Sequence, residues 1–541
     1  MGETGMSQIE GTSAAQGKDD SSPWAALVAI ILGTFTAVLG NSLLNVALPK
    51  LVAVFGSTTS DIQWVVTGYM LASAVVIPMC GFLGDRFGYK RVLMSSLFAF
   101  TAFSFLCGMA WSDTSLIILR ICQGLGGGFI LPIGMSMLYM TFPREKIPVA
   151  LGIWGIAAMA APAIGPTLSG YLMDAFSWRV LFFLNVPVGL FGLFISSIAL
   201  KETPKKEGLT FDTAGAALSI VFFGSLLLAL SKGQSEGWTS FFIVSLFFVS
   251  IFSLILFIWV ETGKEQPLLD LKLFANRTFI ISTIASGFVI IALQGGLYLM
   301  PLYLQNIQAM TPTQTGLLLM PQSIAMAIMM PVSGKLQVKY GVMPLAIVGL
   351  TVATWSTIEL HRLAIDTPHH WINLVLSIRG AAIGLCMSPL STHGMNAVPR
   401  QAVGNASSVA NVLRTAMGSM GIAVFTTIML NHQVYYGARI AENISASTQA
   451  FAQFQYAVTN RYLELGTDVG TATGGANALL AGIVQKEALV RAIADTLAVS
   501  AAATVIAFAF LFLIMKKPAA VPAKEPEAAS GTASVKEAPS T

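Results

Sequence analysis

The sequence has few charged residues. Only 10% of its 541 residues are Asp, Glu, Lys or Arg, whereas 55% are hydrophobic. A soluble protein of this length would carry about 25% charged residues, so the composition excludes an ordinary soluble protein and predicts a polytopic membrane protein. The net charge of +4 comes from basic residues scattered in short loops and does not indicate a nucleic-acid partner.

Cysteines and motifs for chemistry are also scarce. The Cys-x-x-Cys spacing is absent, so neither a metal site nor a disulfide framework is indicated. The four cysteines lie within apolar runs, where we interpret them as small buried side chains: Cys80, Cys107, Cys122 and Cys386. There is no Walker loop, no His-Glu-x-x-His and no Gly-x-Ser-x-Gly. These absences predict a protein that is not an enzyme, that binds no cofactor and that, without an ATP site, takes its energy from an ion gradient.

Long apolar stretches dominate the chain. A membrane-spanning helix needs about 20 apolar residues, and fourteen stretches qualify. They are approximately 24–49, 61–84, 91–111, 114–138, 148–173, 179–200, 212–231, 238–260, 278–303, 313–337, 342–363, 371–398, 404–432 and 494–515. The polar ends, 1–23 and 516–541, are expected to be disordered and cytoplasmic, and the first is not typical of a cleavable signal peptide.

Basic residues are distributed unequally between the two sides of the membrane. With the N-terminus inside, the short inner loops collect sixteen Lys and Arg residues, and the short outer loops collect only four, namely Lys50, Arg179, Lys232 and Arg362. The positive-inside rule therefore predicts that both termini are cytoplasmic. The long polar segment 433–493 then falls outside as an extracytoplasmic loop, with a short amphipathic helix near 479–495.

An internal repeat predicts two halves. The pattern Pro78-x-x-Gly81-x-Leu83-x-x-Arg86-Phe87-Gly88 recurs as Pro331-x-x-Gly334-x-Leu336-x-x-Lys339-Tyr340-Gly341. Each copy ends the second helix of a six-helix set. The pattern predicts an N-terminal bundle over 24–200, two inserted helices with linkers over 201–277, and a C-terminal bundle over 278–515, with a solute path between the bundles.

Six motifs carry a resemblance to a known family. They are "IQWVVTGYMLA" (62–72), "GFLGDRFGYKR" (81–91), "LRICQGLGGG" (119–128), "GIAAMAAPAIGPTLSGYL" (155–172), "WRVLFFLNVPVG" (178–189) and "GNASSVANVLRTAMGSMG" (404–421). In this order they resemble the fourteen-helix drug:proton antiporters of the major facilitator superfamily, the EmrB/QacA-like group. The resemblance extends over residues 24–515. It implies the major facilitator fold, with two six-helix bundles and two inserted transmembrane helices.

Two of these motifs are expected to serve the conformational change. The resemblance makes the loop 81–91 a latch that holds one conformation, while the alternative is that its basic residues only keep the loop inside. The latch residues are Gly81, Gly84, Asp85, Arg86, Gly88, Lys90 and Arg91. The small residues and prolines of the fifth helix are implied to lie between the halves and to favour exchange, or else they give ordinary close packing. They are Gly155, Pro162, Gly165, Pro166 and Gly170.

Acids are nearly absent from the apolar spans, which makes proton coupling the open question. The related group most often has an Asp at the position of Gly40. The resemblance supports a coupling role for Arg120, with a structural tether as the alternative. Asp61 and Glu359 join Arg120 as coupling candidates, and Asp85 or a protonatable substrate remain further options.

Substrate contacts are expected from amide, aromatic and buried basic side chains. The cavity candidates are Asn41, Asn45, Gln63, Trp64, Tyr69, Gln123, Gln294, Tyr298, Arg379 and Arg414. An apolar cavity with few charges suits lipophilic, often cationic compounds. Alternatively, aromatic residues mark the membrane interface, and Arg379 and Arg414 are structural tethers.

The sequence thus predicts a multi-pass protein of the cell inner (plasma) membrane that exports small drug-like molecules in exchange for protons. Its partners would be these substrates, protons and the lipid bilayer, with a periplasmic adaptor where the host has an outer membrane. A gradient-independent facilitator, a lipid or metabolite exporter, and a non-transporting sensor or assembly subunit are the alternatives.

Overall fold

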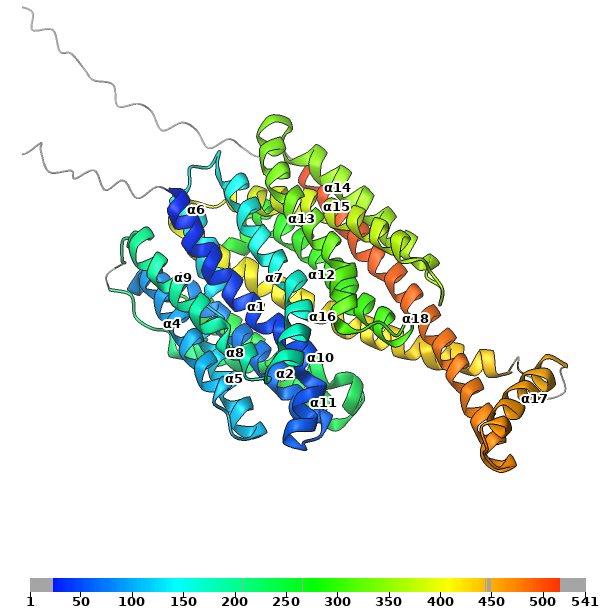
Figure 1. Ribbon diagram of the computed structural model, residues 1–541. Helices are drawn as coiled ribbons and strands as arrows, with labels where there is room; N and C mark the ends of the chain where they lie inside the picture. Colours follow the sequence, from blue (N-terminus) through cyan, green and yellow to red (C-terminus); the bar gives the residue numbers. More distant parts are fainter. Residues whose placement is uncertain (1–22, 207, 265, 443, 445–448, 516–541) are drawn as a thin grey trace, which may run out of the picture.

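The computed structural model describes residues 23–206, 208–264, 266–442, 444 and 449–515. Every regular element within these ranges is a helix, and 14 spans among them are long and apolar enough to cross a membrane (Figure 1). The predicted all-α polytopic fold is therefore confirmed. Most of the two predicted disordered ends, 1–22 and 516–541, lies outside the described residues.

The first six spans are built from nine helices and one 3-10 turn. Pro78 stands in the 3-10 turn that interrupts the second span, because its ring and missing N–H disturb the helix. The elements are α1 Pro23–Phe55, α2 Thr59–Val76, η1 Ile77–Met79, α3 Cys80–Phe87, α4 Tyr89–Gly108, α5 Asp113–Gly127, α6 Ile130–Thr141, α7 Ile147–Ala175, α8 Val180–Phe183 and α9 Asn185–Ala199.

The remaining chain forms two inserted helices and a second helical set. The inserted helices are α10 Thr213–Glu236 and α11 Phe241–Thr262. The second set comprises η2 Leu271–Ala275, α12 Arg277–Asn306, α13 Pro312–Tyr340, α14 Val342–Glu359, η3 Leu360–Arg362, α15 His369–Asn396, η4 Arg400–Ala402, α16 Val403–Glu442, α17 Gln449–Glu464 and α18 Val469–Met515.

The two copies of the internal repeat make the same turn. Gly88 after α3 has φ of +93°, and Gly341 after α13 has φ of +82°. Residues with a side chain rarely adopt such angles, which explains why each copy ends on glycine. In both halves this turn connects the second span of the set to the third.

Each half packs mainly within itself, and a few helices join the halves. Helix α1 lies against α7 and α9, whereas α12 lies against α16 and α18. Across the interface α7 runs along α13, and α16 contacts α3 and α6. Glycines permit this approach: a Cβ on Gly152 of α7 would stand 2.4 Å from the Cα of Pro331 on α13.

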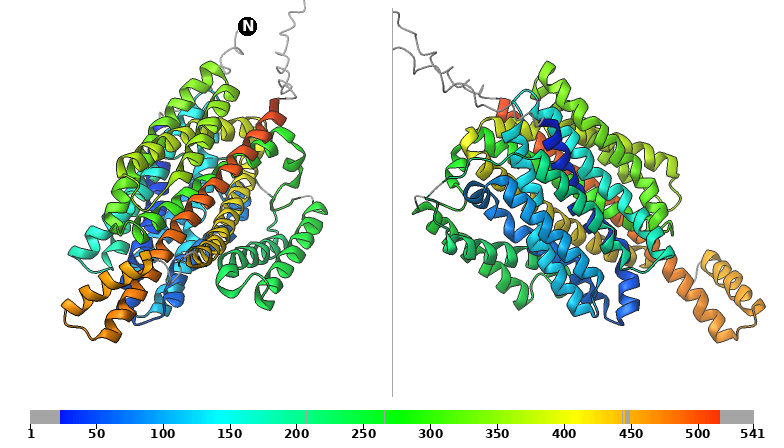
Figure 2. Two further views of the ribbon diagram at one scale, coloured as in Figure 1. Left: turned by 90° about the vertical axis from the view of Figure 1, so that its right-hand side faces the viewer. Right: turned by 60° about the vertical axis from the view of Figure 1, so that its left-hand side comes forward.

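The inserted helices α10 and α11 pack against each other at one edge of the molecule. Helix α10 contacts both α2 of the first half and α16 of the second (Figure 2). The Trp238 Nε1 atom, just after α10, donates a hydrogen bond of 3.0 Å to Thr427 Oγ1 on α16. The inserted pair therefore bridges the two halves along the side where α2 and α16 face each other.

The segment 433–493, expected to be a loop with one short helix, is mostly helical in the described residues. Helix α16 continues to Glu442, α17 follows, and α18 begins at Val469 and runs without interruption to Met515. The segment is rich in Ala and other good helix formers, so the continuous helices of the last two spans extend beyond the bundle. Figure 1 shows this helical hairpin projecting from one end.

The two ends of the described chain lie together at the other end of the molecule. Pro23 begins α1 and Met515 ends α18 at the end opposite to the projecting hairpin (Figures 1 and 2). We call this the terminal end of the molecule. The latch loop 81–91 and its counterpart at Gly341 both precede the third span of their half and lie at this end.

Candidate functional site

A cavity of 260 Å³ lies between helices of the two halves. Helices α1, α2 and α6 line one side of it and α16 lines the other. Its surface is largely apolar, with polar groups contributed by Asn41, Tyr69, Ser73, Asn411 and Thr415. Among the described residues, no acid lines it. Such a lining can hold an apolar ligand and orient it through a few hydrogen bonds.

Arg120 of α5 is buried against two residues of this cavity. Its guanidinium lies 4.1 Å from the ring centroid of Tyr69, and its Nη2 atom donates to Asn41 Oδ1 at 3.5 Å. Other donors reach Val65 O at 3.0 Å and Gln123 Oε1 at 2.7 Å. Because no carboxylate is among these partners, the positive charge is held by dipoles and by an aromatic face.

The side chains around Gly40 leave no room for an acidic side chain at this position of α1. A Cβ at Gly40 would stand 2.9 Å from the Phe100 ring and 3.3 Å from Asn185 Nδ2. These two side chains fill the space that an acidic side chain would need. Asn41, one residue later, turns instead toward Arg120. The side chain of Asn45 is outside the described residues.

A second cavity, of 290 Å³, opens nearer the end with the helical hairpin. Gln63, Trp64 and Thr67 of α2 line one wall, and residues of α10 and Leu430 of α16 line the others. The Nζ atom of Lys232 lies 5.8 Å from the ring centroid of Trp64. The structure thus brings the predicted Gln63 and Trp64 to a cavity, and it adds α10, which sequence patterns did not place there.

The two halves touch closely at the terminal end. Ser407 Oγ of α16 donates to Pro132 O of α6 at 3.2 Å, and Ser388 Oγ of α15 donates to Pro148 O of α7 at 3.4 Å. A Cβ on Gly334 would stand 2.4 Å from that same Pro148 oxygen. The two serines and the two prolines are buried, and Gly334 has no side chain. The central cavity is therefore sealed from the terminal end.

The predicted latch loop is tied to the linker between α9 and α10. Asp85 Oδ2 forms an ion pair of 2.5 Å with Lys206 Nζ, and Asp85 Oδ1 accepts a hydrogen bond of 3.0 Å from Tyr89 OH. The main chain joins in, because Asp85 O accepts from Lys206 N at 2.9 Å. We call the described residues 201–206 and 208–212 the linker.

The basic residues of the loop bind the same linker and the end of α9. Arg86 Nη1 donates to Leu209 O at 2.7 Å, and Lys90 Nζ donates to Ser197 O at 2.8 Å. Arg91 Nε pairs with Glu202 at 3.2 Å. The loop therefore fastens the linker to the first half.

The glycines of the loop allow contacts across the halves. A Cβ on Gly81 would stand 2.2 Å from Asn405 Oδ1 of α16, and one on Gly84 would overlap the Tyr89 ring. Gly88, the third glycine, holds the positive φ of the turn and lies against Glu202. Substituting any of the three would disturb a turn or a close approach.

The small residues predicted on the fifth span lie along two neighbours. Gly155 and Gly170 face Met330 and Thr313 of α13, whereas Gly165 faces Ser42 of α1. Pro162 is partly buried and does not interrupt α7. The side chain of Pro166 is outside the described residues. Helix α7 is thus in contact with both halves along its length.

Other predicted cavity residues lie within the bundles. Gln123 is fully buried beside Arg120 and donates to Phe100 O at 3.3 Å. Gln294 lies beside Gly418 of α16, and Tyr298 packs on an apolar cluster of the second half. None of these three side chains lines either cavity described above. Gln123 acts on the central cavity only through Arg120.

The two remaining arginines differ in position. Arg379 is fully buried, with Nε donating to Thr357 Oγ1 at 3.1 Å and Nη2 donating to Ala292 O. Arg414 Nη2 donates to Ser391 Oγ at 2.8 Å, and its Nη1 reaches Met135 Sδ of the first half at 3.7 Å. Arg379 is therefore a tether within the second half, while Arg414 contacts both halves near Asn411.

The predicted acids at helix ends are partnered there. Asp61 is exposed and accepts from Thr58 at the start of α2 at 2.6 Å. Glu359 pairs with Arg362 at 2.7 Å at the end of α14. Neither lines the central cavity.

Two clusters of titratable groups were not expected from the sequence. Asp212 and Glu261 meet at the terminal end beside Lys264, and Asp495 meets His361 and His432 at the base of the helical hairpin. Their members come from different elements, so their spacing in the sequence carries no signal. Glu261 had one usable signal, because it is the only acid in the apolar run of α11.

Comparison with protein families identifies one matching model. The model described as Major Facilitator Superfamily matches residues 30–422. The MFS-type transporter YhcA of Bacillus subtilis is 37% identical over 456 residues, covering 84% of this chain and 86% of that protein. The resemblance stated from the motifs is confirmed by these matches.

Relatives named as multidrug proteins are similar over much of the chain. The multidrug resistance protein Stp of Mycobacterium tuberculosis is 32% identical over 407 residues, covering 74% of this chain and 75% of Stp. The multidrug export protein EmrB of Escherichia coli K12 is 30% identical over 424 residues, covering 77% of this chain and 82% of EmrB.

Among solved structures, the fold is similar to the human organic anion transporter MFSD10. The TM-score is 0.59 at 11% identity, with 90% of this chain and 99% of that chain covered. At this identity the likeness concerns the fold alone.

Proposed function

Because the chain belongs to the major facilitator superfamily, we propose that it exports small amphipathic or lipophilic compounds in exchange for protons. The chain is a multi-pass membrane transporter and not an enzyme. Transport would proceed by alternating access, in which a central site opens to one side of the membrane at a time. The multidrug relatives supply the substrate class.

The observation that carries this proposal is a cavity between the halves that is sealed at one end. The seal is made by the contacts of Ser388, Ser407 and Gly334 at the terminal end. An exporter needs such a seal in order to release its substrate on the far side without opening a continuous pore. The contacts involve few and small groups, so they can be broken and remade during a cycle.

The lining of the cavity supports a lipophilic substrate. Tyr69 presents an aromatic ring, Asn41 and Asn411 present amides, and the rest of the lining is largely apolar. Arg120 holds Tyr69 and Asn41 in place from behind. An aromatic ring with nearby amides can bind cationic and neutral compounds alike, through cation–π contact and hydrogen bonding.

The orientation follows from charge. Basic residues gather in the short loops at the terminal end, such as Arg86, Lys90 and Arg91, and under the positive-inside rule this supports a cytoplasmic location for this end. The protein would reside in the cell (plasma) membrane with both termini inside. The hairpin of α16, α17 and α18 would then project outward, where it could reach an adaptor in a host with an outer membrane.

Reconstitution tests the proposal directly. The purified protein is placed in liposomes, and movement of a lipophilic cationic dye is followed together with an internal pH indicator. We expect dye flux to accelerate when a proton gradient runs against the direction of dye movement, and to fall when a protonophore removes the gradient. Dye flux that is indifferent to the gradient would remove proton exchange from the proposal.

A facilitator is the second candidate function. It is favoured by one observation, that no acid is found among the residues lining the central cavity. A facilitator would equilibrate the dye at the same rate with and without the protonophore. A resistance profile, obtained by expressing the gene in a pump-deficient cell, would identify compounds to use in both assays.

A further inference from the structure

Two acidic residues meet at the terminal end beneath the inserted helices. Asp212 precedes α10 and Glu261 lies near the end of α11. Glu261 is only 2% exposed and Asp212 only 5%. Acidic side chains are rarely buried to this extent without cationic partners.

The outer oxygens of the two carboxyl groups face each other. A Cβ on Gly215 would stand 2.2 Å from Glu261 Oε1 and 2.6 Å from Asp212 Oδ2, so both oxygens occupy the space that Gly215 leaves open. Both oxygens are buried, and neither has a hydrogen-bond partner among the residues that the structure describes, which do not include 207 and 265. A proton on one of the two carboxyl groups would relieve the repulsion between them.

Asp212 and Glu261 differ in their hydrogen-bond and ion-pair partners. Asp212 Oδ1 accepts from the Gly215 amide at 2.7 Å and forms an ion pair with Lys264. The Glu261 carboxyl forms no ion pair among the described residues; it accepts a long hydrogen bond of 3.4 Å from the Leu269 amide and interacts with the Leu268 amide and, more distantly, with Lys264. Two adjacent carboxylates are costly to ionise together. Lys264 forms its ion pair with Asp212, so the proton of the pair is placed on Glu261.

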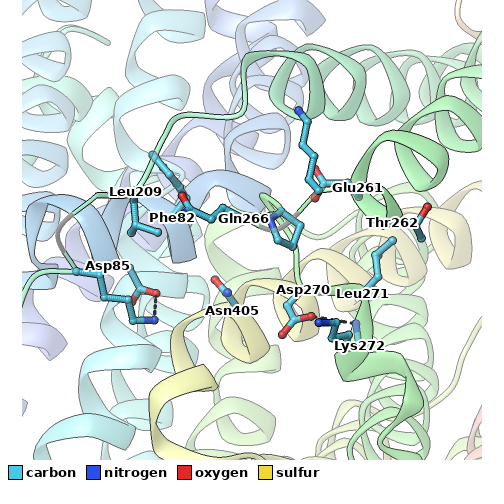
Figure 3. A pocket seen from close by; sticks show the side chains of 13 residues that line it. Phe82, Asp85, Leu209, Glu261, Thr262, Gln266, Asp270, Leu271, Lys272 and Asn405 are labelled. Atoms are coloured by element: carbon cyan, nitrogen blue, oxygen red, sulfur yellow. Dashed lines mark hydrogen bonds and ion pairs between the residues drawn. The ribbon is translucent and has the colours of Figure 1, made fainter.

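A pocket connects this pair to the latch. It has a volume of 480 Å³, and its charged lining residues come from several elements: Asp85, Lys206, Glu261, Lys264, Asp270 and Lys272. Figure 3 shows Asp85 and Glu261 among the side chains around it, with Gln266 between them in this view. The pocket is polar and roomy enough for water, so Glu261 can exchange its proton with the solution at the terminal end.

The linker joins the two sites covalently. Lys206 binds Asp85 of the latch, and Leu209 O accepts from Arg86. The linker ends at Asp212, and Thr210 N donates to Gln266 Oε1 at 3.0 Å in the segment that follows α11. A displacement of Asp212 would therefore pull on the residues that hold the latch.

We propose that the Asp212–Glu261 pair is a proton-binding site that controls the latch from the inner side. With the proton bound, the pair shares a hydrogen bond, the linker stays in place and the inner end stays closed. When the proton passes to water in the pocket, Glu261 becomes a carboxylate that repels Asp212, and the displaced linker releases Asp85. This inference takes the inner orientation from the proposed function, but it does not require that the exported substrate be exchanged for protons.

The test measures opening of the inner end at equal pH on both sides. The four native cysteines are replaced, and Ser407→Cys, buried between the halves, reports opening through its rate of reaction with a thiol reagent. Glu261→Gln imitates the protonated state. Asp270→Asn is the matched control, because Asp270 lines the same pocket and its turn with Lys272 tolerates an amide.

We expect labelling to increase with pH in the otherwise unchanged protein. A single titrating group changes the equilibrium by up to about tenfold per pH unit. The Asp270→Asn control should keep this dependence, whereas Glu261→Gln should label slowly at every pH. A flat response without the Glu261 substitution, or an unchanged response with it, would overturn the site.

A second variant and a second measurement distinguish loss of the proton-binding site from misfolding of the Glu261→Gln protein. Asp212→Asn should also abolish the pH response, because it removes the repulsion. Infrared spectra of the protein with unaltered acids should show a protonated carboxyl band that disappears as pH rises, and its absence would overturn the site. Since no gradient is applied, loss of proton exchange in the dye assay and loss of this site are separate results.

Discussion

Each half of the molecule buries one arginine in a corresponding span, and the two arginines have different surroundings. Arg120 in α5 reaches Asn41 and lies against Tyr69, both of which line the central cavity. Arg379 in α15 reaches only groups within the second half, Thr357 and Ala292. The arginine of the first half therefore contacts residues that line the central cavity. The arginine in the corresponding span of the second half contacts only residues of its own helix bundle.

The two copies of the repeat also have different surroundings in the two halves. The first copy, ending at Gly88, is surrounded by ion pairs from Asp85 and Arg91 to the linker. In the second copy, Lys339 lies over the exposed ring of Tyr340, 5.1 Å from its centroid. The backbone turn is common to both halves, but only the first copy includes an acid and faces the linker. Symmetry of the fold does not carry over to symmetry of function.

The largest effect is expected from replacing the two arginines by the same residue. Arg120→Met should reduce dye export by about 100-fold or more, because Asn41 and Tyr69 lose the charged donors that position them. Arg379→Met should retain export in the folded protein, since Thr357 Oγ1 also donates to Ala353 O and a buried cation is replaced by an apolar side chain of similar size. Export per folded molecule, with folding checked by thermal melting, makes the comparison. An equal loss of dye export in the two variants would mean that export depends on Arg379 as much as on Arg120.

A smaller effect is expected from the paired glycines of the repeat. Gly334→Ala puts a methyl group against the main-chain oxygen of Pro148, whereas Gly81→Ala meets first the movable side chain of Asn405. Overpacking against backbone costs about 1–3 kcal/mol, so Gly334→Ala should open the inner end more than Gly81→Ala. Labelling of Ser407→Cys measures both. If Gly81→Ala gives faster labelling than Gly334→Ala, the contact between α3 and α16 is the stronger of the two closures.

The latch pair should contribute less. Asp85→Asn removes the charge that pairs with the half-exposed Lys206 and should favour the inner-open state by up to about 1 kcal/mol, equivalent to roughly fivefold faster labelling of Ser407→Cys. Lys339→Gln, next to Val338, which is the position of the second copy that matches Asp85, should leave labelling unchanged. If Lys339→Gln labels as fast as Asp85→Asn, the two copies are functionally equivalent.

The smallest effects are expected at the acids of the helix ends. Asp61→Asn in the first half and Glu359→Gln in the second each disturb a cap or an ion pair that includes an exposed residue, worth below about 1 kcal/mol. We expect both variants to export dye with the same dependence on the pH gradient as the unaltered protein. Loss of that dependence in either one would identify it as the carrier of the coupled proton.

Most of the fold could be predicted from the sequence. Fourteen apolar stretches gave fourteen spans, because a lipid-exposed backbone must satisfy its own hydrogen bonds and a helix does so locally. The repeat located the turns at Gly88 and Gly341, since positive φ restricts the residue type. The segment 433–493 was expected to contain one amphipathic helix, yet its described residues are mostly helical, because polar residues do not prevent continuous helices from leaving the bundle.

The candidate site was predictable only in part. Arg120, Asn41 and Tyr69 could be named because polar and charged groups in apolar spans are costly and therefore conspicuous. The same signal also named Arg379, whose partners turned out to be structural. Depth in the membrane is a property of one helix, whereas facing a cavity depends on the neighbours of that helix.

What the sequence determined by itself was local: which stretches span the membrane, where the chain must turn and where α1 lacks an acid. The tertiary structure decided which groups share a space. Phe100 and Asn185 close the position beside Gly40, and Glu261 is brought against Asp212 across the inserted helices. The physical reason is that burial, charge repulsion and hydrogen bonding act over a few ångströms in space, at whatever distance along the chain the partners lie.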